Sequence, residues 1–360
     1  MSRSKLGTFE AILLVLSILA PFTVISLSRT MINETKSSTL LNIIYITIIC
    51  LVIAFLIYKL FKKFPGLDIL DISQYLGGNI FKNIIGFIFI FYFVITSSIF
   101  LRSFCEGLKV VYFPYTDIVY VLLLFIIAVA VTNTLGFSST IRTTSIILPF
   151  LIVSIILLFV GNFNNFSFYR IFPILGDGFK DTFVLGLTNI GCFAGITYLY
   201  FLPPLLKEPE KFKYVSILSV LLSGLFIFMC VATLLFMFSI YISTDEIMPL
   251  FSVSRYIEFG SFFQRFESLF LLIWAISFCC YLSISCKFST HILKKIFNLK
   301  DSTQLTYILL ILTFVLALLP KNYSIISHFE INIYRYLSIA IMLLGILVLI
   351  LSNLKKKAGD

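Results

Sequence analysis

Ten apolar runs divide this chain and constrain its fold more than any other feature. Most of them approach the ~20 residues that an α-helix needs to cross the hydrocarbon core of a bilayer. The segments between them are short and carry most of the charged residues. The expected membrane spans, numbered 1 to 10, are residues 9–27, 40–61, 84–106, 117–135, 143–160, 183–204, 215–240, 265–286, 305–319 and 331–351.

Composition excludes a soluble fold. Hydrophobic residues make up 60% of the chain and charged residues 12%, whereas about a quarter of a soluble domain is charged. The net charge of +10 does not indicate nucleic-acid binding, because the basic residues lie in short loops, where they set membrane topology. With ten spans, 17 of the 27 lysines and arginines fall on the side of the termini. We therefore expect an all-α integral membrane protein, a single domain over residues 1–360, with both termini in the cytoplasm.

Span 6 is unusual because three glycines and the polar pair Thr188 and Asn189 interrupt it. Glycine lowers helix stability by up to about 1 kcal/mol relative to alanine. Backbone leaves the helical conformation inside a membrane only where protein or a cavity surrounds it. One interpretation of Thr188–Gly195 is thus a helix break that faces a cavity. The other is a continuous helix whose glycines allow close packing on a neighbour.

Span 1 carries the second irregularity, since Pro21 removes a backbone donor near its middle. Ten spans divide as five plus five, and spans 1 and 6 then hold corresponding positions. Two interrupted helices at such positions indicate an inverted-repeat transporter fold with a ligand site near the midplane. We expect the repeats at about residues 1–161 and 182–352, and this correspondence favours the break in span 6.

The candidate ligand-binding residues are small or polar side chains on four spans. They are Ser17, Ala20 and Pro21 of span 1, Ser97 and Ser98 of span 3, Thr188, Asn189, Gly191 and Cys192 of span 6, and Trp274 and Ser277 of span 8. Trp274 is the only tryptophan, and packing is an equally simple explanation for it. We expect no metal and no cofactor, because the sequence holds no metal-ligand cluster or phosphate loop.

A few charged residues lie near span ends. Arg102 and Glu106 are four apart and share a helix face, which predicts an ion pair at the membrane edge. Arg265 and Glu267 begin span 8, where either a functional role or structural pairing fits. Residues 62–82 alternate apolar and polar side chains, as a short amphipathic helix on the interface does.

The loop into span 8 carries the most specific motif. Met248–Ile257 reads MPLFSVSRYI, Phe263–Phe270 reads FQRFESLF, and Trp274 follows. This pattern, which includes Pro249, Arg255, Arg265 and Glu267, resembles the spore germination permease family, the B subunits of endospore germinant receptors. Looser likenesses cover the rest of the chain. They are FPGL at 64–67 with YLGG at 75–78, Arg102 to Glu106 with Phe113-Pro114, and Pro204 with Lys207. Span 1 departs from the pattern because it lacks a glycine-rich turn.

The resemblance implies a function that composition and spacing do not show. Such proteins belong to the amino acid–polyamine–organocation superfamily and lie in the inner membrane of the dormant spore. They work with a membrane A subunit and a lipoprotein C subunit, and they recognise small germinants such as amino acids or nucleosides. Pro249, Arg255, Arg265 and Glu267, with Arg102 and Glu106, would then have structural or coupling roles.

Two functions from different classes therefore remain open. The first is a ligand sensor that passes germinant binding to partner subunits. The second is an amino-acid transporter of the same superfamily that works alone. We do not expect an enzyme, because no nucleophile and base stand at a catalytic spacing.

Overall fold

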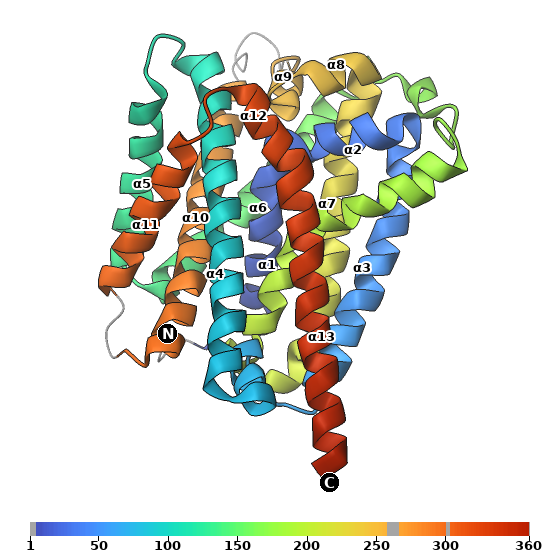
Figure 1. The fold of residues 1–360 in the computed structure, drawn as a ribbon. Helices are drawn as coiled ribbons and strands as arrows, with labels where there is room; N and C mark the ends of the chain where they lie inside the picture. The colour runs from blue at the N-terminus through green and yellow to red at the C-terminus, as the bar shows by residue number, and fades with distance from the viewer. Residues whose placement is uncertain (1–4, 258–265, 300–302, 360) are drawn as a thin grey trace.

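An apolar chain in a bilayer must satisfy its backbone hydrogen bonds within itself, and helices meet that need. The computed structural model describes residues 5–257, 266–299 and 303–359, which are almost entirely helical. The long helices stand side by side, and both chain ends lie at the same end of the bundle (Figure 1). This placement agrees with an even number of spans.

The first half of the chain runs from α1 to η5. Its helices are α1 (Thr8–Phe22), η1 (Thr23–Leu27), α2 (Ser28–Thr35), η2 (Lys36–Ser38), α3 (Thr39–Phe61), α4 (Ile69–Tyr112), α5 (Ile118–Thr134), α6 (Phe137–Gly161), η3 (Phe163–Asn165), η4 (Phe168–Ile171) and η5 (Lys180–Val184). The second half comprises η6 (Leu185–Phe201), η7 (Pro203–Leu205), η8 (Pro209–Lys211), α7 (Phe212–Met237), α8 (Ile240–Asp245), α9 (Pro249–Ser254), α10 (Phe266–Phe297), α11 (Thr303–Leu318), α12 (Tyr323–His328), η9 (Phe329–Tyr334) and α13 (Arg335–Gly359).

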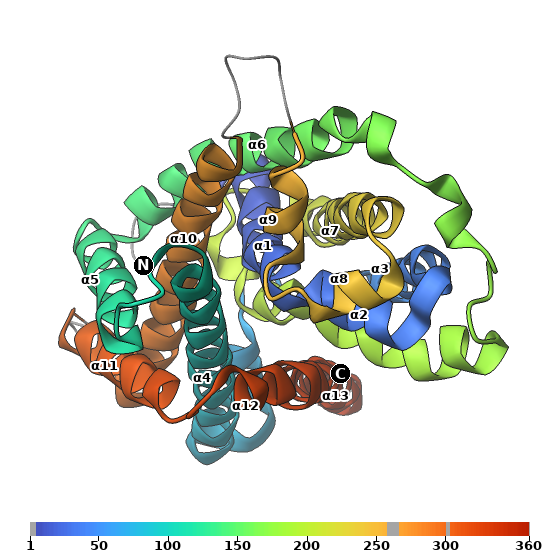
Figure 2. The same cartoon turned by 90° about the horizontal axis from the view of Figure 1, so that it is seen from above.

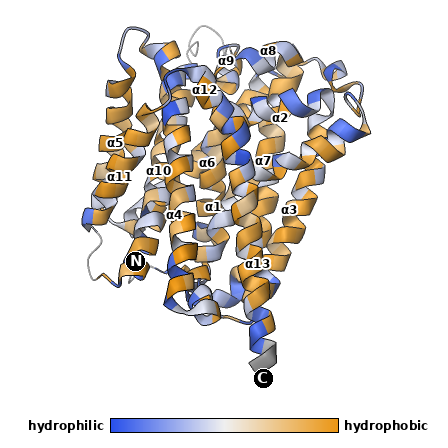
Figure 3. Cartoon of the chain, viewed as in Figure 1, coloured by the Kyte–Doolittle hydropathy of each residue, from blue (hydrophilic) through white to orange (hydrophobic). Residues whose placement is uncertain are grey.

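The predicted spans correspond to helices of the structure. In the part of the chain that the structure describes, seven helices are long and apolar enough to cross a membrane, and α1, α5 and α11 are shorter apolar helices. Hydrophobic residues cover the upright helices, and hydrophilic residues gather toward the two ends of the bundle (Figure 3). The fold is therefore the expected all-α membrane fold.

The interruption of span 1 takes the form of a wider helix. Pro21 stays inside α1, and the backbone changes to a π-helix over η1 before α2 begins. A π-helical segment is frequently found at functional sites. Beyond it, α2 lies across the direction of α1 (Figures 1 and 2).

A short helix is present at the start of α4, in the segment where the sequence predicted an interfacial helix. Asp68 caps it by accepting hydrogen bonds from the backbone N–H groups of Leu70 and Asp71. The helical conformation is interrupted at Gly77 and Gly78, where Gly78 has a positive φ of 71°. Glycine adopts a positive φ without strain. The kink at Gly77 and Gly78 separates this short helix from span 3.

Asp68 also anchors the interfacial helix to α10. Its fully buried carboxylate lies 2.5 Å from Lys295 Nζ and 3.5 Å from His291 Nε2, and Lys295 also contacts Asp71 at 2.8 Å. Burial acts to raise the pKa of Asp68, but hydrogen bonds from His291 and Lys295 and the charge of Lys295 outweigh it and hold the pKa below its ordinary value. The end of the bundle that holds the termini is thus fixed by a buried ion pair.

The chain start is tied to the end of span 6. Leu6 forms an isolated bridge with Leu206, with its N–H 2.7 Å from the Leu205 carbonyl and its carbonyl 2.9 Å from the Lys207 N–H. Spans 1 and 6 therefore approach each other at this end of the bundle.

Candidate functional site

Span 6 is broken within the predicted stretch. Its backbone is π-helical over η5 and mainly 3-10 helical over η6, and Phe193 leaves the helical region with φ −83° and ψ 39°. Long 3-10 segments are uncommon because their hydrogen-bond geometry is poor. The break at Phe193 lies inside Thr188–Gly195, so the sequence located it correctly.

Five polar side chains meet beside this break, and we call them the break cluster: Glu34, Asn42, Thr188, Asn189 and Arg335. They come from α2, α3, η6 and α13. Glu34 and Arg335 form a close ion pair, and Thr188 donates to Glu34 at 3.3 Å. Asn189 accepts from Arg335 at 3.4 Å and donates to Asn42 at 3.0 Å. The broken span thus carries a charged and largely buried polar site.

The glycines of span 6 allow its backbone to approach its neighbours. A Cβ on Gly191 would lie 2.4 Å from the carbonyl oxygen of Arg335, and one on Gly195 would lie 3.0 Å from that of Val15. Such contacts leave no room for a side chain. The helix therefore breaks, as the first interpretation predicts, and its glycines also pack closely on α1 and α13.

A hollow lies beside the broken span. Its volume is about 300 Å³, and its lining includes Thr188 and Ile190 of η6, Ile53 of α3 and Met342 of α13. The lining is almost entirely apolar, so this hollow suits a hydrocarbon chain better than a charged ligand. The polar cluster at the break offers the contrasting chemistry.

The span 1 candidates are buried and already hydrogen-bonded. Ser17 donates to the Leu14 carbonyl at 2.7 Å, and the Ala20 carbonyl accepts from Thr23 at 2.7 Å. Pro21 is buried inside α1. Its neighbour Phe22 makes the contacts with other spans.

Four rings, which we call the central aromatic cluster, meet between spans 1, 3, 8 and 10. Phe22 stacks on Phe100 with ring centres 3.7 Å apart, and Tyr281 meets Phe22 edge-on at 4.6 Å. Tyr334 meets Phe100 edge-on at 4.6 Å. Since all four residues are buried, they close the region in which the sequence predicted a ligand.

Ser97 and Ser98 lie on span 3 but do not share one environment. Ser97 donates to Ser285 of α10 at 2.8 Å, beside a cavity of about 10 Å³. Such a volume holds at most about one water molecule. Ser98 donates to the Val94 carbonyl within its own helix. Ser97 is therefore the one that links spans 3 and 8.

Trp274 and Ser277 are buried on α10. The Trp274 ring lies 5.4 Å from Phe270 and 6.2 Å from Phe226 of α7, measured between ring centres. Its indole Nε1 has no hydrogen-bond partner among the described residues. These contacts favour packing as the role of Trp274.

Cys192 completes the candidate set of span 6. It is buried, and the preceding residue, Gly191, packs on the backbone of Arg335. The structure thus brings Thr188, Asn189, Gly191 and Cys192 together around Arg335. It does not place them in one open pocket with Ser97, Ser98, Trp274 and Ser277.

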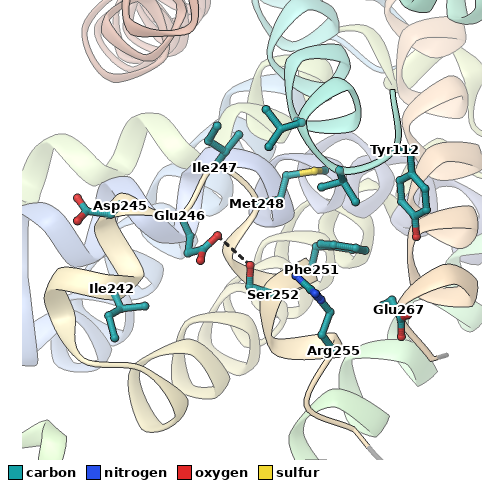
Figure 4. A pocket seen from close by; sticks show the side chains of 13 residues that line it. Tyr112, Ile242, Asp245, Glu246, Ile247, Met248, Phe251, Ser252, Arg255 and Glu267 are labelled. Atoms are coloured by element: carbon teal, nitrogen blue, oxygen red, sulfur yellow. Dashed lines mark hydrogen bonds between the residues drawn. The ribbon is translucent and has the colours of Figure 1, made fainter. Parts of the chain in front are cut away.

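The span 8 motif lines an outer pocket, at the end of the bundle opposite the termini (Figures 1 and 4). Its volume is about 780 Å³, and its walls come from the end of α4, from α8 and α9, and from the start of α10. Arg255 and Glu267 lie on the same side of this pocket, and Glu246 accepts a hydrogen bond from Ser252 at 2.9 Å. Pro249 begins α9. Arg265 lies outside the described residues.

The predicted pair of Arg102 and Glu106 is formed, with the guanidinium 2.8 Å from the carboxylate. Arg102 also donates to the Ala317 carbonyl of α11 at 3.1 Å. The pair therefore joins spans 3 and 9, which fits a structural role.

Two ion pairs that the sequence analysis missed join α2 to the start of span 10. Glu34 pairs with Arg335, and Arg29 Nη2 lies 3.9 Å from Glu330 Oε2. The sequence did contain a clue to them. Glu330 and Arg335 stand at the start of an apolar run, and charges in membrane segments are functional candidates. We call these contacts the α2 ion pairs.

The comparisons with known proteins agree with the membrane fold described above. A family model described as spore germination protein matches residues 5–326. Spore germination protein A2 of Bacillus subtilis is 26% identical over 364 residues, covering 98% of this chain and 97% of the relative. Spore germination protein B2 of the same organism is 23% identical, covering 99% and 98%.

Solved structures support the fold. A nucleobase-cation-symport-1 family transporter, Mhp1, matches with a TM-score of 0.65 at 10% identity, covering 92% of this chain and 75% of its own. A Na⁺-coupled sialic acid symporter matches with a TM-score of 0.61 at 13% identity, covering 93% and 76%. The fold is that of these transporters, and the similar proteins are transporters or permease-like proteins rather than enzymes.

Proposed function

Because the chain belongs to the spore germination permease family, we propose that it is a membrane subunit of a spore germinant receptor. In this proposal it binds a small germinant, an amino acid or a nucleoside, near the break in span 6 and signals to partner subunits. The observation that carries the proposal is the break cluster, where a broken membrane helix meets an ion pair between the buried Arg335 and the partly buried Glu34.

The chemistry of the break cluster favours an amino acid. The guanidinium of Arg335 suits a ligand carboxylate, and the carboxylate of Glu34 suits an ammonium group. Asn189 and Asn42 add amide donors and acceptors beside them. A zwitterion would replace the ion pair between Glu34 and Arg335 with two ion pairs of its own. A nucleoside has no such pair of charges, so it would use the amides alone.

Signalling requires that ligand binding change the contacts between spans. The central aromatic cluster holds spans 1, 3, 8 and 10 together in the present conformation. We propose that the ligand acts by altering the position of Arg335 and hence of Tyr334, the residue before it. Arg255, Glu267 and the outer pocket are proposed to take part in coupling, together with Pro249 and the pair of Arg102 and Glu106.

The proposed partners are a membrane A subunit and a lipoprotein C subunit, and the proposed location is the inner membrane of the spore. The named relatives, germination proteins A2 and B2 of Bacillus subtilis, support a receptor system of this kind. Both termini are proposed to be cytoplasmic, because most basic residues lie at their end of the bundle. The two halves are proposed to be inverted repeats of about 1–161 and 182–352.

A ligand screen on the purified protein tests this function. Amino acids and nucleosides are added singly, and the shift in melting temperature is measured. The test variant is Thr188→Val and the control is Thr134→Val, because each threonine donates to the carbonyl three residues before it but only Thr188 also donates to Glu34. We expect an amino-acid shift that weakens in Thr188→Val alone. Equal shifts in the two variants would refute a site at the break.

The alternative is an amino-acid transporter that works alone, and the transporter fold favours it. It predicts saturable uptake of the screened ligand into vesicles that contain only this chain. Binding without uptake in such vesicles would support the receptor function over the transporter.

A further inference from the structure

Glu330 is a buried carboxylate whose charge is poorly compensated. It lies in the π-helical segment η9, inside a helix long and apolar enough to cross a membrane, and its side chain is 2% exposed. Neither carboxylate oxygen accepts a hydrogen bond from the described residues. The hydroxyl groups of Ser26 and Ser103 lie nearby. An ionised carboxylate normally persists in such a place only when it is paired and hydrogen-bonded.

The nearest cation pairs with it only loosely. Arg29 Nη2 lies 3.9 Å from Glu330 Oε2, at the outer limit of an ion pair. The same nitrogen donates to Ser327 at 3.1 Å, and the guanidinium carbon lies 5.4 Å from the centre of the Tyr323 ring. Arg29 therefore has other partners that hold it when it is not bound to Glu330.

The other charged groups nearby are already engaged. Arg102 and Glu106 of α4 pair with each other at 2.8 Å. From α12, Tyr323 lies in the field of Arg29, Glu330 and Glu106. Arg29 of α2 is thus the cation that competes with a proton for Glu330.

A cavity adjoins the partners of Arg29. A cavity of about 420 Å³ on the outer side is lined by Tyr323, Ser327 and His328, among others. Ser327 belongs both to this cavity and to the hydrogen-bonding partners of Arg29. The cavity therefore borders a hydrogen-bonding partner of Arg29.

We propose that Glu330 is a proton-binding site in which a proton and Arg29 compete for the carboxylate. Proton binding converts Glu330 to the neutral acid and leaves Arg29 on Ser327 and Tyr323. It thereby releases one of the two α2 ion pairs, while the pair between Glu34 and Arg335 remains. Movement of α2 against span 10 is then linked to protonation, and this link does not depend on the identity of the germinant.

Infrared spectroscopy of the full-length protein in lipid nanodiscs tests the proposal. The carbonyl stretch of a protonated carboxyl group is followed as the pH is changed between acid and alkaline values. We expect one component of the titrating carbonyl band of the wild type to be lost in Glu330→Gln, a substitution that keeps the shape of the neutral acid. The matched control is Glu106→Gln, which removes a partly buried carboxylate that is paired with Arg102 and should keep that component.

The proposal is overturned if the wild type and Glu330→Gln show the same titrating carbonyl intensity, because the other acidic side chains titrate in both proteins. If Glu330→Gln fails to fold, Arg29→Gln replaces it as the test. Removing the competing positive charge disfavours the ionised carboxylate, so the midpoint of the band should move to higher pH. An unchanged midpoint in Arg29→Gln would also overturn the proposal.

Discussion

Replacing Asp68 with asparagine should destabilise the protein more than any comparable change at the end of the bundle that holds the termini. Asparagine is an equally good helix cap, so the change keeps the cap of α4 and removes only the negative charge. The carboxylate is fully buried and lies 2.5 Å from Lys295 Nζ. Without it, Lys295 keeps the partly exposed Asp71 as its acidic partner among the described residues, and His291 loses its contact with the Asp68 carboxylate.

The magnitude follows from burial. Removing one partner of a buried ion pair costs roughly 3–5 kcal/mol, because the other charge is left uncompensated. Lys295 is 27% exposed, so we expect a value near the lower end of that range. Asp71→Asn is the matched control, since its carboxylate is 32% exposed and pairs of this kind contribute about 0.2–1 kcal/mol.

The assay is the free energy of unfolding of both variants in the same micelles, together with its pH dependence. The pKa of Asp68 is lowered in the folded protein. Its stabilisation is therefore fully present above the ordinary carboxyl pKa of about 3.9, and it is lost as the pH falls through the lowered folded value. The reasoning is refuted if Asp68→Asn costs no more than Asp71→Asn at neutral pH.

Two further predictions concern spans 6 and 8. Gly191→Ala should lower the free energy of unfolding by roughly 1–3 kcal/mol in the same assay, as an overpacked contact does, because the new Cβ meets the backbone of Arg335. Gly7→Ala serves as the control, since its Cβ would lie 3.6 Å from Glu10. Equal losses in the two variants would argue against close packing at the break. Trp274→Phe should keep the ligand-induced melting shift, because Trp274 packs against Phe270; loss of the shift in a folded variant would instead make Trp274 part of the ligand site.

The sequence predicted the spans because the hydrophobic requirement is local. Each apolar run had to be a helix, whatever its neighbours are, since an open backbone is not tolerated in lipid. The interfacial helix before span 3 and the pair of Arg102 and Glu106 were predicted for the same reason, because both depend on residues within one turn or two. The break in span 6 could also be predicted, since glycines and polar residues within a few positions weaken that helix.

The ion pairs between distant helices could not be predicted from the sequence in this way. Glu34 and Arg335, like Arg29 and Glu330, are separated by about 300 positions in the chain. By the expected spans, Arg29, Glu34 and Glu330 lie just outside a span and Arg335 lies near the start of one, and charges are common at such positions. Only the packing of α2 against span 10 brings these charges together.

The candidate site shows the same division. The sequence named Thr188, Asn189 and Gly191, and the structure added Arg335, the cation that they surround. In the structure, the rings of the central aromatic cluster occupy the space where the sequence predicted a ligand, and no local pattern indicated this. What the sequence determined by itself was which segments are helices in a membrane and where one of them is weak, because those properties depend on neighbouring residues and on lipid. Which charges become buried partners was decided by tertiary structure alone, because pairing depends on distances between helices that the order of residues does not specify.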